Sequence, residues 1–217
     1  SQYLDEMKSI HLLIKCLEVD ESISFHPDIV IHPVNYDTLV IAPNVYDYYS
    51  NALYGTNIKL IRGEKKLEVN YPYDIAYNVG RMYGIAISNF EYTDEVLKYY
   101  LEKEGLELIN VKQGYTKCSI AVVDEMSAIT ADMLIYKVLI EKGYSVLLIE
   151  PGYIDLEYKK YGFIGGATGN YSKDILFLSG ILDSHPDKQK ILKFIKSKNK
   201  NIHILSEKNI VDIGTII

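Results

Sequence analysis

One cysteine near the middle of the sequence is among the residues of this chain best suited to take part in a reaction. Cys118 is one of only two cysteines, and a thiol becomes a nucleophile when nearby cations lower its pKa. Lys112 and Lys117 lie close to it in the sequence and could lower that pKa if they face the sulfur. A free cysteine is also commonly a small buried hydrophobic residue, so both interpretations of Cys118 stay open.

Two tripeptides place a histidine two residues before an aspartate. They are His26-Pro27-Asp28 and His185-Pro186-Asp187. A histidine can exchange a proton near neutral pH, but a proline between the two residues also makes a rigid turn. Asp187 is expected to cap the helix that follows it. A structural role is therefore favoured for both histidines, and more strongly for His185.

Three further polar residues are candidates for an inward-facing ligand site. Asn78, Arg81 and Asp212 lie where neighbouring units could point polar groups toward a centre. Gly165-Gly166 would allow a close backbone approach, either to a ligand or to a neighbouring unit. The chain contains no phosphate-loop, dinucleotide or zinc-ligand spacing, so no cofactor and no metal are expected.

The elements that must position these residues form a unit that recurs about four times. Short apolar strands end at residues 41, 87, 130 and 178, so their spacing is nearly constant. Each unit is predicted to be a two-strand hairpin, a helix and a further strand. The units cover residues 24–65, 73–112, 117–150 and 161–206. A period of this length indicates a propeller, solenoid or similar array.

Local signals place the elements inside each unit. The first strands are predicted at 28–32, 75–79, 118–123 and 163–166, and the helices at about 44–53, 93–105, 133–142 and 187–198. Asn44, Asp132 and Asp187 are expected helix caps, since their side chains can accept hydrogen bonds from the first backbone amides. The third strands are predicted at 58–61, 106–111, 144–149 and 202–205.

The two ends of the chain predict a fifth unit. Residues 2–9 resemble a short helix, and residues 10–19 and 210–217 resemble strands. Pairing 207–217 with 1–20 would close a ring and remove exposed sheet edges. The prediction is a single α/β domain over residues 1–217, a five-bladed propeller of ββαβ repeats. An open doubly wound sheet would instead need strict strand–helix alternation.

Composition excludes several classes of protein. The net charge of −6 argues against a free-standing nucleic-acid binder, and the basic stretch Lys188–Lys200 is interpreted as a solvated helix face. No stretch approaches the length of a membrane span, so no membrane partner is expected. Two isolated cysteines favour the reducing cytoplasm. Many Tyr, Ile and Lys with few Arg suggest a bacterial source. The oligomeric state is not predicted.

Three stretches resemble an uncharacterised bacterial family that is assigned to the pentein fold, the fold of the guanidine-modifying enzymes. They are residues 111–119 (VKQGYTKCS), 161–169 (YGFIGGATG) and 211–214 (VDIG). The resemblance covers about residues 24–217. It implies a five-bladed α/β propeller with a central channel, but it brings no known reaction with it.

The resemblance also implies what a site would contain. Pentein enzymes use a nucleophilic cysteine near the C-terminus, a histidine followed by an acidic residue, and carboxylates that hold a guanidinium. This chain has no cysteine or histidine after His203, so the usual nucleophile is absent. If the chain is an enzyme, Cys118 is the expected nucleophile, with His26 as acid/base and Asp28 or Asp212 as anionic ligands. Asn78, Arg81, Lys112, Asp212 and His185 are the expected ligand-binding residues.

Two classes of function therefore stay open. The first is a protein that binds or modifies a small cationic guanidinium or amidine ligand in the channel. The second is a non-catalytic pentein that acts as a binding protein, a scaffold or a ribosome-associated factor. A ligand sensor that has kept the pocket and lost the chemistry is a third possibility. The missing C-terminal cysteine favours the non-catalytic class, and fold analogy alone cannot choose.

Overall fold

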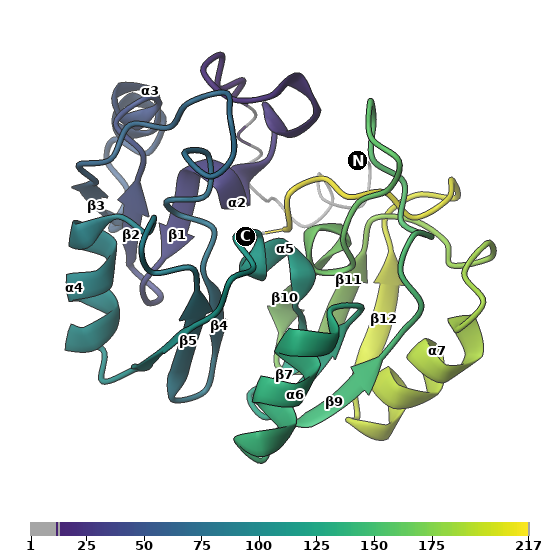
Figure 1. Cartoon of the computed structure of the whole chain (residues 1–217). Helices are drawn as coiled ribbons and strands as arrows, with labels where there is room; N and C mark the ends of the chain where they lie inside the picture. The colour runs from purple at the N-terminus through teal and green to yellow at the C-terminus, as the bar shows by residue number, and fades with distance from the viewer. Residues whose placement is uncertain (1–11, 13, 217) are drawn as a thin grey trace.

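The fold repeats one small sheet several times around a common centre. The computed structural model describes residue 12 and residues 14–216, and Figure 1 shows the sheets set around a region where α2, α5 and the C-terminal end lie. Four three-stranded sheets are present in this part of the chain. In each, the first two strands pair antiparallel, and the third pairs parallel to the second. Each unit is thus ββαβ, as predicted.

The strands are short and nearly equal in length. The first sheet contains β1 (Ile31–Pro33), β2 (Thr38–Ile41) and β3 (Lys59–Arg62), and the second contains β4 (Gly80–Met82), β5 (Ile85–Ser88) and β6 (Glu107–Asn110). The third contains β7 (Ala121–Asp124), β8 (Ser127–Thr130) and β9 (Ser145–Leu148), and the fourth contains β10 (Thr168–Ser172), β11 (Ile175–Leu178) and β12 (Asn201–Ile204). The middle strand of each sheet is the apolar run from which the period was inferred.

A helix connects the second and third strand of every sheet. These helices are α3 (Tyr46–Ala52), α4 (Glu95–Lys103), α6 (Met133–Glu141) and α7 (Lys188–Ser197). The last three bury pairs of apolar side chains four residues apart, one turn along the same face: Leu97 and Leu101, Ile135 and Leu139, Ile191 and Ile195. Burial of this face against the sheet is what holds each short helix in place.

The first strand of each unit begins later than the sequence predicts. Residues 27–30 form α2 (Pro27–Val30) and residues 116–119 form α5 (Thr116–Ser119), while η2 (Gly165–Ala167) precedes the fourth sheet. Residues 75–79 form turns and loop before β4. These runs were expected to be strands because they are apolar. They are instead largely buried near the centre, in helical turns in three units and in a loop at 75–79.

The ends of the chain differ from the predicted fifth blade. Residues 14–19 form no strand, residues 2–9 lie outside the described part, and residues 210–216 make only an isolated bridge, between Val211 and Asp155. The C-terminal segment nevertheless joins two units. Ile213 N and Thr215 N donate to Gly166 O in the fourth unit, and Asp28 N in the first unit donates to Gly214 O at 3.1 Å.

The core is divided among the units. One cluster of buried side chains lies under the first two sheets, a second under the last two, and a third between the middle sheets. A further short helix, η1 (Glu21–Ile23), precedes α2 and contributes Ile23 to the first cluster. No helix in the described part of the chain is long and apolar enough to cross a membrane.

Candidate functional site

Cys118 lies at the centre of the molecule rather than in an apolar packing position. It is held by α5 and is 2% exposed. Its Sγ lies 3.1 Å from Asp28 Oδ2 and 3.0 Å from Asn78 Nδ2. Three units therefore contribute one polar side chain each to the same contact. A cysteine that served only as a small hydrophobe would not need these partners.

Asn78 fixes this arrangement through both ends of its amide. Its Nδ2 donates to Asp28 O at 3.1 Å as well as to the sulfur. Its Oδ1 accepts from Lys117 N at 2.9 Å and from Cys118 N at 3.4 Å. All donors and acceptors of a buried amide are thus occupied. The amide of Asn78 thus joins the units, and its expected role in binding a ligand stays a prediction.

His26 and Asp212 form the opposite side of the centre. Both are buried, and His26 Nδ1 lies 3.7 Å from Asp212 Oδ1, which is too long for a hydrogen bond. Asp212 Oδ2 accepts from Phe163 N at 2.9 Å, and its Oδ1 accepts from Gly214 N at 3.0 Å. The carboxylate is therefore held firmly by two backbone amides, while the imidazole Nδ1 has no hydrogen-bond partner among the described residues.

A cavity of about 620 Å³ opens onto this centre. His26, Cys118 and Asp212 line it together with Asp74 and Tyr115. The structure therefore brings Cys118 and His26 to the same cavity. The volume is in the range typical of small-molecule sites.

Burial controls the electrostatics of the site. Removal from water raises the pKa of the Asp28 carboxyl, which His26 and Lys117 only partly offset. The pKa of Asp212 rises to about 6, because of burial and the nearby Asp28. Burial also lowers the pKa of Lys117, whose Nζ donates to Thr215 Oγ1 at 2.8 Å. The centre therefore disfavours every unpaired charge.

The Cys118 thiol is not activated in this arrangement. Burial, then the charges of Asp28 and Asp212, raise its pKa well above the ordinary value. The expectation that Lys112 and Lys117 lower this pKa is corrected. Lys112 is exposed, and its backbone carbonyl accepts from Tyr71 Oη at 3.5 Å. Lys117 lies close to the centre, but its effect does not outweigh burial and two carboxylates.

Arg81 lies away from this centre. Its guanidinium donates to the carbonyl groups of Pro33 and Val34 and lies 4.0 Å from Glu104. It lines a separate basin of about 1090 Å³ on the side of the hairpin turns. The basin also contains Tyr83 and Met126 from two of those turns. The expected convergence of Arg81 with the other polar residues does not occur.

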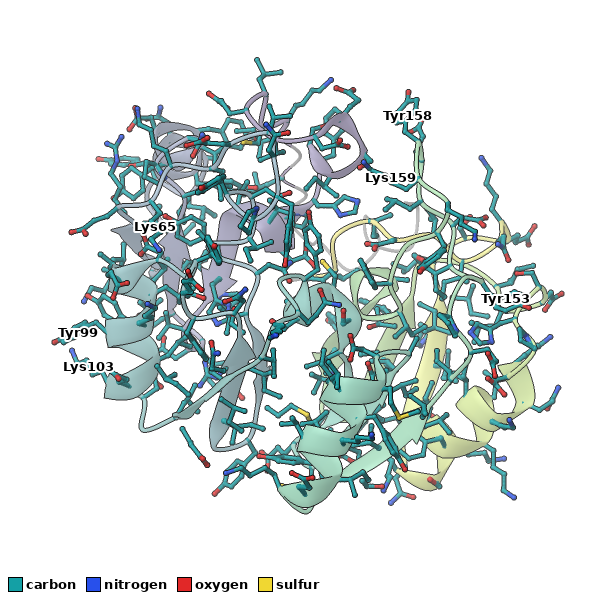
Figure 2. The ribbon with its side chains drawn as sticks, in the orientation of Figure 1. Lys65, Tyr99, Lys103, Tyr153, Tyr158 and Lys159 are labelled. Atoms are coloured by element: carbon teal, nitrogen blue, oxygen red, sulfur yellow. The ribbon has the colours of Figure 1, made fainter. Side chains whose placement is uncertain are left out.

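His185 also lies outside the site. Its Nδ1 accepts from Asp187 N at 3.0 Å, and its ring contacts that of Tyr153 at 5.4 Å. Figure 2 shows Tyr153 at the outer edge of the molecule, beside α7. Asp187 does not cap α7 as expected, since its side chain accepts from Glu150 N and from Lys190 Nζ. The tripeptide 185–187 is thus a turn that links the third and fourth units.

The glycine pair 165–166 serves packing between units. A side chain on Gly165 would meet the carbonyl oxygens of Lys117, Cys118 and Ile120 at 2.5 Å. One on Gly166 would lie 1.9 Å from Asp212 Oδ1. The absence of side chains here lets η2 approach both α5 and the C-terminal segment, so the glycines shape the centre without facing a ligand.

Sequence reasoning missed two residues of the cavity wall. Asp74 is 2% exposed, and its Oδ2 accepts from Tyr115 Oη at 2.6 Å. Asp74 only marked the start of a unit in the sequence, and Tyr115 was one of twenty tyrosines. No single-sequence pattern separates them from other aspartates and tyrosines. Among the described residues, no group of three or more His, Cys, Asp or Glu could hold a metal ion.

Comparisons with known proteins bear on the fold. The model of a family described as a family of unknown function (DUF6873) matches residues 2–217. No curated protein matches the sequence significantly. Among solved structures, agmatine deiminase from C. jejuni matches with a TM-score of 0.52 at 10% identity, over 82% of this chain and 65% of that one. The chain thus spans just under two thirds of that enzyme.

Two other enzymes match similarly. DDAH from Pseudomonas aeruginosa, a cysteine-to-serine mutant complexed with citrulline, has a TM-score of 0.50 at 10% identity, over 83% of this chain and 68% of that one. SxtG, an amidinotransferase from Microseira wollei in the saxitoxin biosynthetic pathway, also matches with a TM-score of 0.50 at 10% identity. This match covers 88% of this chain and 65% of that one. These matches show that the chain has the pentein fold its sequence resembles. At this identity they show the fold alone.

Proposed function

Because the chain belongs to this family of unknown function, its activity must be argued from the site itself, and we propose that the central cavity binds a small cation of the guanidinium or amidine type. The observation that carries the proposal is a group of buried carboxylates at the cavity. Asp74 and Asp212 line it, and Asp28 lies directly behind Cys118, whose Sγ is 3.1 Å from Asp28 Oδ2. Asp28 Oδ1 and Asp74 Oδ1 are buried and have no hydrogen-bond partner within the described part of the chain.

Such oxygens predict a ligand with several N–H donors. A buried acceptor without a partner costs free energy, so a donor supplied by a ligand would be favoured. A planar guanidinium offers paired donors that match a carboxylate, and its positive charge would stabilise the ionised forms of Asp28 and Asp212. The three similar structures support this class, since they are an agmatine deiminase, an amidinotransferase and a DDAH complexed with citrulline.

A covalent step at Cys118 is the second candidate. The observation that favours it is the 3.1 Å contact from Cys118 Sγ to Asp28 Oδ2. A bound cation at the centre would lower the cost of a thiolate there. The sulfur would then attack the amidine carbon while its proton passes to Asp28, and an amine would leave after taking a proton from His26. The raised pKa of the thiol in the free protein favours binding without chemistry.

The binding proposal is tested by calorimetry with agmatine and guanidinium chloride at neutral pH. We expect Asp28→Asn and Asp212→Asn to weaken binding by about tenfold or more, because each removes one negative charge at the centre. Asp174→Asn is the matched control, since Asp174 lies exposed in the turn between β10 and β11. Equal affinities in all four proteins would contradict the proposal.

The covalent candidate has its own test. The protein is incubated with agmatine or another guanidinium compound, and intact mass and ammonia release are followed over time. We expect an adduct on the wild type that Cys118→Ser lacks, if the step occurs. Tight binding without adduct or ammonia would leave the protein a non-catalytic ligand binder. The second candidate would then be wrong while the first stands.

A further inference from the structure

The mouth of the central cavity combines aromatic rings with a buried carboxylate. Asp74, Tyr71, Tyr115 and Phe163 all line the cavity that Cys118 and Asp212 line. The rings of Tyr71 and Tyr115 have centroids 5.8 Å apart, and those of Tyr115 and Phe163 are 6.1 Å apart. These three side chains therefore form a continuous aromatic wall beside Asp74.

Asp74 is the polar member of this wall, and one of its oxygens is unused. The residue is 2% exposed, Oδ2 accepts from Tyr115 Oη at 2.6 Å, and Oδ1 has no hydrogen-bond partner among the described residues. Tyr115 thus orients the carboxylate and leaves its other oxygen without a partner. The Asp74 carboxylate makes no ion pair within 4 Å among the described residues, and burial raises its pKa, although the charge of Lys159 acts to lower it. A buried carboxylate next to aromatic rings suits an organic cation, which gains both charge pairing and cation–π attraction.

No lysine or arginine in the described part of the chain forms a hydrogen bond or an ion pair with Asp74. Lys159 lines the same mouth from the loop after β9, where Figure 2 shows it, but its Nζ is held by Asp20 Oδ2 at 3.0 Å. Asp212 lines the cavity with Cys118, and Asp28 lies against the Cys118 sulfur. The cavity therefore presents two separate acidic positions, an inner one at the centre and an outer one at Asp74.

We infer that the outer position is a second cation subsite, formed by Asp74 with Tyr71, Tyr115 and Phe163, so that the ligand is a dication with an alkylammonium group besides its inner amidinium-type group. This inference rests on the proposed function for the inner group. It excludes free amino acids as preferred ligands, because an α-carboxylate at the mouth would lie beside Asp74 and be repelled.

The test compares ligands that differ only in the second charge. Calorimetry measures the affinities of agmatine, of n-butylguanidinium, which lacks the terminal ammonium, and of arginine, which adds an α-carboxylate. We expect agmatine to bind wild-type protein about tenfold or more tightly than the other two. Asp74→Asn should remove that advantage while n-butylguanidinium keeps its affinity, since asparagine can still accept the Tyr115 hydrogen bond.

A second pair of variants guards against loss of folding at Asp74. Tyr71 is 51% exposed, so Tyr71→Leu should leave the fold intact and weaken the binding of agmatine several-fold. Tyr71→Phe retains the ring and should retain the affinity for agmatine. Equal binding of agmatine and n-butylguanidinium to wild-type protein would overturn the inference. The same holds if Asp74→Asn lowers the affinities for agmatine and for n-butylguanidinium by the same factor.

The same titrations separate this inference from the proposed function. If 1,4-diaminobutane binds in an Asp74-dependent way and no guanidinium compound binds, the outer subsite stands and the inner assignment fails. If n-butylguanidinium binds in an Asp28-dependent way but Asp74→Asn changes nothing, the inner assignment stands and the outer subsite fails. Absence of binding by every probe would overturn both.

Discussion

At the scale of single residues, the centre is governed by the cost of burying charge. Cys118 Sγ lies 3.1 Å from Asp28 Oδ2, the charge of Asp212 also acts on the thiol, and all three residues are buried. Burial of this kind raises the pKa of acids and thiols. A ligand cation would reverse this effect, so the ionisation of the site and its occupancy should be coupled.

Cys118 should react slowly with iodoacetamide in the free protein. Only the thiolate reacts, and burial with Asp28 raises the pKa of this thiol well above its usual value. At pH 8.5 we expect a rate at least about tenfold below that of free cysteine. Asp28→Asn should increase the rate, because it removes a negative charge beside the sulfur. Peptide mass mapping distinguishes Cys118 from the buried Cys16.

A fast reaction at neutral pH would contradict this description of the thiol. Cys118→Ser provides the background rate, since the remaining Cys16 is buried and burial raises its pKa to about 11. If Asp28→Asn leaves the rate of Cys118 unchanged while the fold is intact, the carboxylate does not control the thiol.

Affinity for a cationic ligand should rise with pH between about pH 5 and 7. The pKa of Asp212 is raised to about 6, so its ionised fraction grows as the pH increases through that value. A cation binds the ionised form better, and affinity should level off above pH 7. Asp28 and His26 face the same carboxylate and contribute to the profile. Calorimetry across this range checks it, and Asp212→Asn should flatten it.

Asn78→Ala should destabilise the protein far more than an exposed substitution. It removes an amide that bonds to Asp28, Lys117 and Cys118, and leaves buried polar groups unpaired. The expected loss in the free energy of unfolding is about 3 kcal/mol or more, at about 1–3 kcal/mol for each orphaned group. Asn51→Ala in α3 is the control, with an expected change of about 0.5 kcal/mol or less. Urea unfolding measures both.

At the scale of elements, the sequence predicts the regular parts of each unit well. The middle strands, third strands and four main helices lie within a few residues of their predicted bounds, because their apolar spacing follows local burial. The first strands were misplaced, since residues such as Ile29 and Ile120 are apolar but sit in or beside helical turns packed on every side. Apolar runs alone do not distinguish these two environments.

The helix caps show the same limit. Asp132 caps α6 as predicted, accepting from Leu134 N and Ile135 N. Asn44 instead bonds to the backbone of Leu67, and α3 begins after Val45 without a side-chain cap. Local pattern identifies a polar residue before a helix. It cannot say whether a segment distant in the sequence, here the loop after β3, competes for that side chain.

Much of the site was beyond local reasoning for a related reason. Cys118, Asp28 and Asp212 were singled out from residue type and resemblance, and they meet. Asp74 and Tyr115 were not, because their roles depend on a contact across 41 positions of sequence. Arg81 and His185 were expected at the centre, but each forms hydrogen bonds with other residues away from it. Only the tertiary arrangement decides which of several similar polar residues reaches the site.

Asp94→Ala should cost more stability than Asp132→Ala, although both residues cap helices. Asp94 is fully buried and accepts from Leu97 N, from the backbone amides of Glu64 and Lys65, and from Tyr77 Oη. It therefore joins α4 to the segment after β3. We expect about 3 kcal/mol or more for Asp94→Ala and about 1 kcal/mol for Asp132→Ala. Equal losses in chemical denaturation would contradict this.

At the scale of the whole molecule, the C-terminal segment holds the first and fourth units together. Gly214 has φ +73°, and a side chain there would lie 2.3 Å from His26 Cβ. This close approach lets Asp28 N reach Gly214 O. The link between the two units therefore depends on one residue without a side chain, and the same segment supplies Asp212 to the cavity.

Gly214→Ala should destabilise the protein more than Gly105→Ala. The two glycines have nearly the same backbone, φ +73° and +75°, but nothing lies within 4 Å of a side chain on Gly105. Gly105→Ala should cost about 1 kcal/mol from the left-handed backbone alone. Gly214→Ala adds the overlap with His26, so thermal unfolding should show a clearly larger loss, and ligand affinity should fall as well. Similar losses would mean that the contact with His26 is relaxed easily.

The link between Asp28 and Gly214 also has a kinetic consequence. These residues are separated by most of the chain, so their contact closes a very long loop, and such contacts form after the local ones. Each ββαβ unit can assemble early from neighbouring residues, whereas Asp28 and Asp212 are brought together only when the last segment docks. A cation held between them would slow the departure of that segment, and its binding would report that the chain has completed the final step of folding.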